Sequence, residues 1–532
     1  MTLFLTNSGQ TRKRLVQAGA VFAAVALVAG CGSVYRAVVT PIGNSGPEPQ
    51  PSGYAIVVSA PSPTTPGIAT IIDYSGDSVL AYANIGPGPS LVSVNYSSTA
   101  GYTLNSDGTL SNFPVSPQLQ AKQVSFTTLN STSQPGPPHP PVNMFSTSGG
   151  IWAADLNGNY ADIFSSSTGV QAFDLAIPVA TTPVFIVGPA VSGLRNYVIS
   201  QDFDDPTGVA CNISPTTAPV NGEADGILIS TLTRTSQIVL DPANPTNSPT
   251  GSKNGMCPVY AVQSPDNRRF FVMNRGSDTI TVINSQDDTL DNQCPTGCVN
   301  QDNQKYYTHP ILPLSTTALA STGVVPPNCN IGADPTCGGM TAIAGPVYAE
   351  YNAATSQLIV ANYDGGTISV IDVSEDVYGN DSPTFGTTYT IPVGKNPASV
   401  TVLTDGTRAY TANQTDQTAT IVNLSSHTVE KTLPVTGHPR TVVSAQNSQF
   451  GKVYVASPDS PYITIIRTDL DIIDTTILVE GNVVDVRVSS QTLLSGNINE
   501  TSRSPGHGQP CNLPPSLETV SPLTLAACQA QP

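Results

Sequence analysis

Short apolar segments rich in β-branched residues recur along this chain, and polar turn residues separate them. In the C-terminal half they span Thr279–Asn284, Thr367–Asp372, Thr418–Asn423 and Ile463–Arg467, and each follows a similar segment in the sequence. Runs of about 4–8 residues with this composition predict strands. No long helical periodicity is seen beyond the N-terminal region. The pattern predicts an all-β protein.

The strand pattern repeats at a fixed spacing in this half of the chain. The stretch Lys395–Gly437 matches the stretch His438–Gly481, so that Pro397 and Pro439 lie 42 residues apart. A period of roughly 40–50 residues that holds four short strands is typical of a β-propeller blade. A single four-stranded sheet cannot bury both faces, whereas blades stacked around a ring cover one another. The repeat therefore predicts a β-propeller.

The number of blades follows from counting these patterns. Four repeats are clear, and they begin near Pro258, Pro346, Pro397 and Pro439. Three further blades are inferred upstream from paired strand patterns: Ser78–Asn84 with Leu91–Asn95, Ile151–Asp155 with Tyr160–Phe164, and Asn196–Ser200 with Gly226–Ser230. The sequence thus predicts seven four-stranded blades, with six or eight as alternatives.

Two segments at the ends of the repeat region complete the expected ring. Gly481–Val488 follows the last repeat and has the pattern of a first strand with no blade after it. Tyr54–Val58 has a strand pattern and is expected to dock on the propeller. We expect Gly481–Val488 to pair with the N-terminal blade and close the ring.

The repeat resembles the YVTN family of β-propeller repeats. The residues that carry the resemblance are Val393-Gly394-Lys395-Asn396-Pro397, Asp405-Gly406, Tyr410, Asn413 and Thr418–Asn423. The likeness covers Cys257–Gly481, apart from a Cys-rich insertion at about residues 290–340. It implies the propeller fold, but it implies no single activity, because one fold hosts many functions.

The N-terminus has the features of a bacterial lipoprotein signal peptide over residues 1–30. Arg12, Lys13 and Arg14 precede an apolar run that ends in Leu27-Val-Ala-Gly-Cys31, which resembles a lipobox. The resemblance implies that Cys31 is acylated and becomes the new N-terminus. A plain secretory signal with a chance cysteine is the alternative. Gly32, where inner-membrane lipoproteins often carry Asp, favours the outer membrane by analogy.

The rest of the chain divides by composition. A Pro-rich tether spans residues 31–52, the propeller spans residues 53–490, and a Pro- and Ser-rich tail spans residues 491–532. Pro-rich linkers are extended and semi-rigid. The tether would therefore hold the propeller off the bilayer, with the protein exported and anchored in the cell envelope.

The cysteine count supports export. Without Cys31, an even number of cysteines remains, which fits disulfides in an oxidising compartment. Proximity in sequence suggests the pairs Cys294–Cys298, Cys329–Cys337 and Cys511–Cys528, which leaves Cys211–Cys257. The spacing of Cys294 and Cys298 would also permit zinc. No histidine lies near them in the sequence, so disulfides are favoured over a metal site.

The charge of the chain excludes one class of partner. The formal net charge is −17 and charged residues make up only 11% of the chain. Nucleic-acid binding needs a basic face, so it is not expected. Membrane attachment would have to come from acyl chains. Acidic loops such as Asp287-Asp288 with Asp291 are candidates for Ca²⁺, but solvated carboxylates are the simpler interpretation.

A search for catalytic motifs gives no complete constellation. HExxH, GxSxG, CxxCH and phosphate-loop patterns are absent from the sequence, and no cofactor is expected. The candidate ligand-binding residues are Lys395, Asn396, His438 and Arg440, which precede the first strands of two consecutive repeats. Cationic side chains at a channel mouth suit an anionic ligand, although loop surface is the simpler interpretation.

Two functions remain open at this point. The first is a lipid-anchored, non-catalytic scaffold that binds a protein or glycan in the envelope. The second is a lactonase-like hydrolase at the channel mouth. Gly437-His438-Pro439-Arg440 resembles a loop of bacterial 6-phosphogluconolactonase-type propellers, but Thr441 stands where that family usually has a histidine. A missing acid/base residue favours the scaffold.

Overall fold

The computed structural model describes residues 53–489, without positions 63, 96, 129–142, 148–149, 157, 167–170, 190–193, 202–220, 249, 292–307, 315–343, 376–380 and 445–450. All of these residues belong to one compact unit of the chain, residues 39–532. The predicted signal peptide, tether and tail lie outside the described residues, as does most of the Cys-rich insertion. Among the described residues, no helix is long and apolar enough to span a bilayer.

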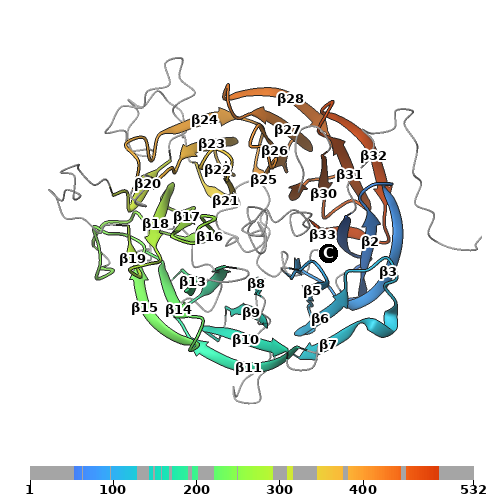
Figure 1. The fold of residues 1–532 in the computed structure, drawn as a ribbon, viewed down its shortest axis with the longest axis horizontal. Helices are drawn as coiled ribbons and strands as arrows, with labels where there is room; N and C mark the ends of the chain where they lie inside the picture. Colours follow the sequence, from blue (N-terminus) through green and yellow to red (C-terminus); the bar gives the residue numbers. More distant parts are fainter. Residues whose placement is uncertain are drawn as a thin grey trace, which may run out of the picture. The chain divides into compact units, whose positions relative to one another are not determined.

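The described strands form eight four-stranded blades, and the innermost strands contact one another in a closed circle (Figure 1). The blades are numbered along the chain, and each is given from its innermost to its outermost strand. Blade 1 contains β33 (Asn482–Val488), β1 (Tyr54–Ala60), β2 (Pro66–Asp73) and β3 (Ser78–Pro87). Blade 2 contains β4 (Val92–Val94), β5 (Ala100–Leu104), β6 (Thr109–Pro114) and β7 (Ser125–Thr128), with the 3-10 helix η1 (Ala121–Gln123) before β7.

The next two blades follow the same order. Blade 3 contains β8 (Asn143–Ser146), β9 (Gly150–Asp155), β10 (Tyr160–Ser166) and β11 (Gln171–Pro178). Blade 4 contains β12 (Pro183–Val187), β13 (Arg195–Ser200), β14 (Glu223–Leu228) and β15 (Thr233–Val239). The predicted strand pairs in these two blades are confirmed, because β9 pairs with β10 and β13 pairs with β14.

The C-terminal repeats form the remaining four blades. Blade 5 contains β16 (Pro258–Gln263), β17 (Arg269–Asn274), β18 (Thr279–Asn284) and β19 (Thr289–Leu290), and β20 (Ile311–Pro313) also pairs with β18. Blade 6 contains β21 (Pro346–Asn352), β22 (Gln357–Asn362), β23 (Thr367–Asp372) and β24 (Thr388–Pro392). Blade 7 contains β25 (Pro397–Val402), β26 (Arg408–Asn413), β27 (Thr418–Asn423) and β28 (Thr428–Pro434). Blade 8 contains β29 (Thr441–Ser444), β30 (Lys452–Ala456), β31 (Tyr462–Arg467) and β32 (Ile472–Leu478).

The predicted count of seven blades is wrong, because one predicted blade is in fact two. Ser78–Asn84 lies in β3, the outermost strand of blade 1, whereas Leu91–Asn95 contains β4, the innermost strand of blade 2. The loop between them is so short that a link between blades resembles a hairpin within one blade. The all-β class, the propeller and the four-stranded blades are confirmed, and the count is eight.

The predicted closure of the ring is confirmed. β33 pairs antiparallel with β1, so the C-terminal end of the described chain supplies the innermost strand of the N-terminal blade. Side chains add two bonds at this seam, because Ser59 Oγ donates to Glu480 O at 2.6 Å and Tyr54 N donates to Ser489 Oγ at 2.7 Å. A ring closed in this way has no open seam at which the end blades could separate.

The core of the propeller lies between neighbouring blades. Tyr410 and Ile421 of blade 7 share a buried apolar cluster with Val442 and Val453 of blade 8. Burial of apolar surface is the main source of stability in such a contact. Alternating apolar residues along each strand therefore serve two interfaces, one on each face of the blade.

A recurring asparagine explains why the hairpins between second and third strands form. Asn413 ends β26, and its Nδ2 donates to Thr418 Oγ1 at 3.0 Å and to Thr420 Oγ1 at 2.8 Å. Asn274 and Asn362 make the same pair of bonds in blades 5 and 6. Asn105 does so in blade 2, where no repeat is apparent from the sequence. The amide thus satisfies buried hydroxyls at the start of the third strand.

A second recurring contact, an ion pair between consecutive blades, is found at three junctions. A basic residue starts the second strand of one blade, and an aspartate with positive φ ends the turn before the outermost strand of the next blade. At the junction of blades 4 and 5, Arg195 Nε lies 3.0 Å from Asp288 Oδ2, and Tyr197 Oη donates to Asp288 Oδ1 at 2.9 Å. At the next two such junctions Arg408 pairs with Asp471, and Lys452 pairs with Asp77.

Candidate functional site

The predicted ligand-binding residues lie on or beside the loops that join the outermost strand of one blade to the innermost strand of the next. These inter-blade loops lie on one side of the ring. His438 lies in the inter-blade loop before β29, and about half of its side chain is exposed. Its Nδ1 lies 2.5 Å from Asp459 Oδ2, and its backbone N–H donates to Asp459 Oδ1 at 2.7 Å. The turn between β30 and β31, which holds Asp459, therefore lies on the same side.

His438 is also linked to the preceding blade. Its Nε2 lies 3.1 Å from Nε2 of Gln417, which belongs to the turn between β26 and β27. The neighbouring Asp416 accepts the backbone N–H of Lys395 at 2.8 Å, and the Lys395 residue is exposed. Lys395, Asp416, Gln417, His438 and Asp459 thus form a continuous polar chain across blades 7 and 8, which we call the loop surface.

The electrostatics of the loop surface keep the His438 side chain in place. Burial alone would raise the pKa of Asp459, but the hydrogen bonds from His438 lower it below its usual value. Asp459 is therefore ionised at neutral pH and accepts two bonds from His438. With Asp459 fixing Nδ1 and Gln417 beside Nε2, the ring is held in one orientation while its outer edge remains open to solvent.

Asn396 lies next to the loop surface, but its side chain is buried and its contacts stabilise the fold. The residue has a φ of 54°, in the left-handed region that asparagine tolerates better than most residues. Its Nδ2 donates to Tyr363 O at 3.2 Å, and its Oδ1 accepts from Thr415 Oγ1 at 2.6 Å. These bonds fix the inter-blade loop between blades 6 and 7.

Arg440 lies inside the ring rather than on the loop surface. It is only 3% exposed, and its Nη2 donates to Val484 O, on the closing strand β33, at 2.6 Å. The adjacent Thr441 donates to Asp485 Oδ1 at 3.1 Å, and Asp485 Oδ2 accepts the backbone N–H of Val92. Lys395 and His438 therefore each contact the turn that holds Asp416 and Gln417, whereas Arg440 lies at the seam.

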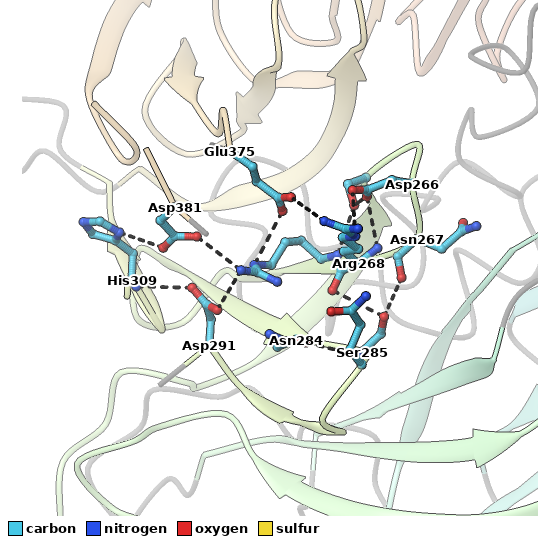
Figure 2. Close-up of polar contacts among 12 residues, drawn as sticks. Asp266, Asn267, Arg268, Asn284, Ser285, Asp291, His309, Glu375 and Asp381 are labelled. Carbon is cyan, nitrogen blue, oxygen red and sulfur yellow. Dashed lines mark hydrogen bonds and ion pairs between the residues drawn. The ribbon is translucent and has the colours of Figure 1, made fainter. Parts of the chain in front are cut away.

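A separate ionic cluster joins blades 5 and 6 on the opposite side of the ring, where the turns before the outermost strands lie. Figure 2 shows Asp291, Asp381, Glu375 and His309 converging from both blades. At its centre is buried Arg269, whose Nη2 lies 3.3 Å from Asp291 Oδ1 and 3.5 Å from Asp381 Oδ1. Arg269 Nε lies 3.8 Å from Glu375 Oε1, and His309 Nδ1 lies 2.8 Å from Asp381 Oδ2. We call these five residues the Arg269 cluster.

The Arg269 cluster holds more carboxyl groups than arginine can neutralise. Burial and the nearby Asp381 raise the pKa of Asp291 to about 7. Burial also raises the pKa of Glu375 to about 7, although Arg269 acts to lower it. Two carboxylates that share one site cannot both ionise easily. The cluster therefore holds protons near neutral pH.

Sequence reasoning missed the Arg269 cluster, although one signal was present. Arg269 starts the second strand of blade 5, as Arg195, Arg408 and Lys452 do in their own blades. A basic residue at the start of the second strand indicates an ion pair with the next blade. The partners could not be found in the same way, because Glu375 and Asp381 lie in a long connection between β23 and β24, whereas the other C-terminal repeats have a short turn between their third and fourth strands.

The acidic candidates for Ca²⁺ have other partners. Asp288 binds Arg195 and Tyr197 of blade 4, whereas Asp291 faces Arg269. Their carboxylates therefore serve different contacts. Within the described ranges, no group of three or more His, Cys, Asp or Glu side chains is arranged to hold a metal ion.

The predicted cysteine sites are almost all beyond the described part of the chain. Cys257 is buried before β16 with a φ of 52°. Cys31, Cys211, Cys294, Cys298, Cys329, Cys337, Cys511 and Cys528 lie outside the described residues. The lipid attachment and the disulfide pairs stay predictions.

Comparisons with known proteins support the fold. No protein-family profile matches the chain, and no curated protein matches it. Among solved structures, AztD from Citrobacter koseri has a TM-score of 0.51 and 13% identity, over 82% of this chain and 98% of that chain. The dihydro-heme d1 dehydrogenase NirN, in complex with DHE, has a TM-score of 0.50 and 9% identity, over 84% and 76%. At these identities the likeness shows the β-propeller fold alone.

Proposed function

We propose that this protein is a lipid-anchored, non-catalytic β-propeller of the bacterial cell envelope that binds its partner through the loop surface. The carrying observation is the chain of bonds from Lys395 through Gln417 to Asp459. Hydrogen bonds hold the side chains of Asp416, Gln417, His438 and Asp459 in place, and Lys395 joins them through its backbone N–H. Side chains that are already ordered lose little conformational entropy on binding, which favours recognition.

The envelope location rests on the N-terminal sequence. The basic residues before the apolar run, and Leu27-Val-Ala-Gly-Cys31 at its end, support export and acylation at Cys31. Gly32 supports the outer membrane by analogy. The YVTN-like repeats support the propeller fold. Their recurring residues have structural roles, since Asn413 and Tyr410 both make hydrogen bonds that hold the blades.

The geometry favours binding over the lactonase-like alternative. A hydrolase at the channel mouth would need His438 and Arg440 to act on one substrate. Instead His438 is engaged by Asp459 and Gln417 on the surface, whereas the Arg440 guanidinium bonds Val484 O inside the ring. Loop positions carried on a rigid scaffold are common binding sites.

The experiment is a thermal-shift screen of the full chain in detergent against purified cell-wall fragments, envelope proteins, sugar phosphates and lactones. The test variant is Lys395→Ala/His438→Ala, and the control is Lys431→Ala on β28, away from the loop surface. We expect an envelope component to raise the melting temperature of the wild type and the control but not of the double variant. Turnover of any lactone, or a shift that survives in the double variant, would overturn the proposal.

A further inference from the structure

The outermost strands of the blades differ in the number of charged side chains that they carry. Several of them carry charged residues, as edge strands usually do: Asp174 on β11, Arg234 on β15, Glu430 and Lys431 on β28, and Asp474 on β32. β3 is the longest strand in the described part of the chain and has the sequence SVLAYANIGP, without a charge. β7, on the next blade, reads SFTT and is also uncharged.

These uncharged strands expose large apolar side chains. On β3, Leu80 is 41% exposed and Tyr82 is 49% exposed, and on β7, Phe126 is 55% exposed. The neighbouring strand β11 does carry a charge, Asp174, but it also exposes Leu175 by 38%. Figure 1 shows β3, β7 and β11 following one another along the rim of blades 1 to 3. We call the exposed side chains of Leu80, Tyr82, Phe126 and Leu175 the rim patch.

We propose that the rim patch rests on the surface of the lipid bilayer to which the chain is anchored. This replaces the expectation that the tether holds the propeller off the bilayer. This inference depends on the proposed acylation of Cys31 and extends it by naming the part of the propeller that meets the membrane. The tether runs from Cys31 to residue 52, and the strand that follows, β1, belongs to the same blade as β3. Blade 1 is therefore the blade held nearest to the anchor along the chain.

Because the tether is short, even a weak contact between the rim patch and the bilayer is enough to keep them together. The tether spans residues 31–52, and Pro-rich chains extend by about 3.1 Å per residue, so the propeller stays within roughly 70 Å of the acyl chains. Confinement at this range corresponds to an effective concentration of about millimolar order. A modest affinity of apolar side chains for the interface is enough to populate the contact.

The chemistry of the rim patch suits the lipid interface. Tyrosine and other aromatic side chains sit favourably at the level of the headgroups, with the ring toward the acyl chains. Lys122 on η1, which contacts β3, supplies a cation for lipid phosphates. The rest of the protein is repelled by anionic lipid, since the net charge is −17. The outermost strands β3 and β7, which carry no charged residue, are therefore the part of the rim patch that can approach a bilayer at least cost.

The test places an environment-sensitive fluorescent amino acid at Tyr82 or Phe126 of the full chain, reconstituted in phosphatidylcholine vesicles. The control position is Val429 on β28, which is 41% exposed but lies in blade 7 among charged residues. We expect blue-shifted emission at 82 and 126 and quenching by brominated lipids at least threefold stronger than at 429. Adding Leu80→Glu should reduce the quenching at 126 by about half.

Several results would overturn the inference. Equal quenching at 82, 126 and 429 would show that the rim patch does not meet the bilayer. A blue shift without lipid quenching, together with a doubled particle mass, would assign the rim patch to a second copy of the chain. Mass spectrometry of the N-terminus distinguishes a failure of the proposed anchor from a failure of the membrane contact. An unacylated Cys31 would remove both, whereas an acylated chain without quenching would remove the membrane contact alone.

Discussion

The junction between blades 7 and 8 and the junction between blades 5 and 6 solve the same problem in different ways. At blades 7 and 8, a single aspartate, Asp471, accepts bonds from both Arg408 and Tyr410 of the previous blade. At blades 5 and 6, Arg269 faces Asp291, Asp381 and Glu375, and His309 joins them. One charge pair is enough where the turn is short, whereas a long connection brings extra carboxyl groups that must share protons.

The two arrangements respond differently to change. The regular junction has a balanced pair and one tyrosine hydroxyl. The Arg269 cluster has an excess of acid, so its energy depends on its arginine and on pH. The following predictions are ordered by the expected effect of the substitution on stability. The first three concern the junctions, and the last concerns the loop surface for comparison.

The largest effect is expected for Arg269→Met. Removing the guanidinium takes the arginine partner from the buried Asp291 and Asp381, and loss of one partner of a buried ion pair costs about 3–5 kcal/mol. The melting temperature should fall accordingly in thermal unfolding monitored by circular dichroism. The control is Arg268→Met, because the Arg268 side chain is 39% exposed and its ion pairs are long, so its loss should cost under about 1 kcal/mol. Equal losses for both variants would contradict the central place of Arg269.

A smaller effect is expected for Asp471→Ala at the regular junction. The change removes the acceptor of Arg408 and of Tyr410, and bonds to a charged group contribute about 1.5–3 kcal/mol. Tyr410→Phe removes only the hydroxyl and should cost about 1 kcal/mol. Urea unfolding measures both, with Glu430→Ala on the exposed edge strand β28 as a near-neutral control. A neutral result for Asp471→Ala would show that this contact, although it recurs at three junctions, adds no stability.

The pH dependence of stability is a further property by which the Arg269 cluster can be tested. The pKa values of Asp291 and Glu375 are raised to about 7 in the folded chain, so the folded state holds protons that the unfolded state has already lost. Stability from these groups is therefore greatest at acid pH and is lost as the pH rises from about 4 to about 7, by at most about 1.4 kcal/mol per pH unit for each group. Melting temperatures across this window measure the slope.

The matched variants for this prediction are Asp291→Asn and Asp266→Asn. Asp291→Asn should flatten the slope between pH 4 and 7, because the amide does not titrate. Asp266 lies beside Arg268 at the edge of the cluster and is about half exposed, so Asp266→Asn should leave the slope nearly unchanged. An unchanged slope in Asp291→Asn would mean that the Arg269 cluster does not hold the protons.

The smallest effect on stability is expected at the loop surface. His438→Ala should change the free energy of unfolding by no more than about 0.5 kcal/mol, because half of the side chain is already in solvent. Thermal unfolding of the variant checks this. A loss above about 2 kcal/mol would make the contact with Asp459 structural, like those at the junctions, and would weaken the case for a binding surface.

Much of the fold was predictable because its signals are local. Asn413 with Thr418 and Thr420 marks a hairpin. Asn105 makes the same kind of bonds to Thr109 and Ser111, but the spacing is one residue shorter, so a search for the repeat does not find blade 2. The eighth blade was missed because the loop between β3 and β4 is as short as a hairpin. Pairing of β33 with β1 was predictable, since an unpaired strand pattern at one end of a propeller needs a partner at the other.

The site was predictable only in part. Lys395 and His438 lie on the surface, as loop residues usually do. Arg440 is buried because it precedes the innermost strand β29 and lies against the closing strand β33, whose Val484 carbonyl it bonds. The repeat spacing predicts that these two strands are neighbours, but it does not report which side chains they cover. The Arg269 cluster was missed because Glu375 and Asp381 come from a connection with no repeat.

The most direct test of the proposed binding function is photo-crosslinking from position 417 of the full chain in intact envelopes. Gln417 lies at the centre of the loop surface, between Lys395 and His438. A photoreactive residue there should give one dominant adduct, which is lost in the Lys395→Ala/His438→Ala background, while the same residue at position 431 on β28 gives none. Equal adducts from positions 417 and 431, or an adduct that persists in the double variant, would contradict the account.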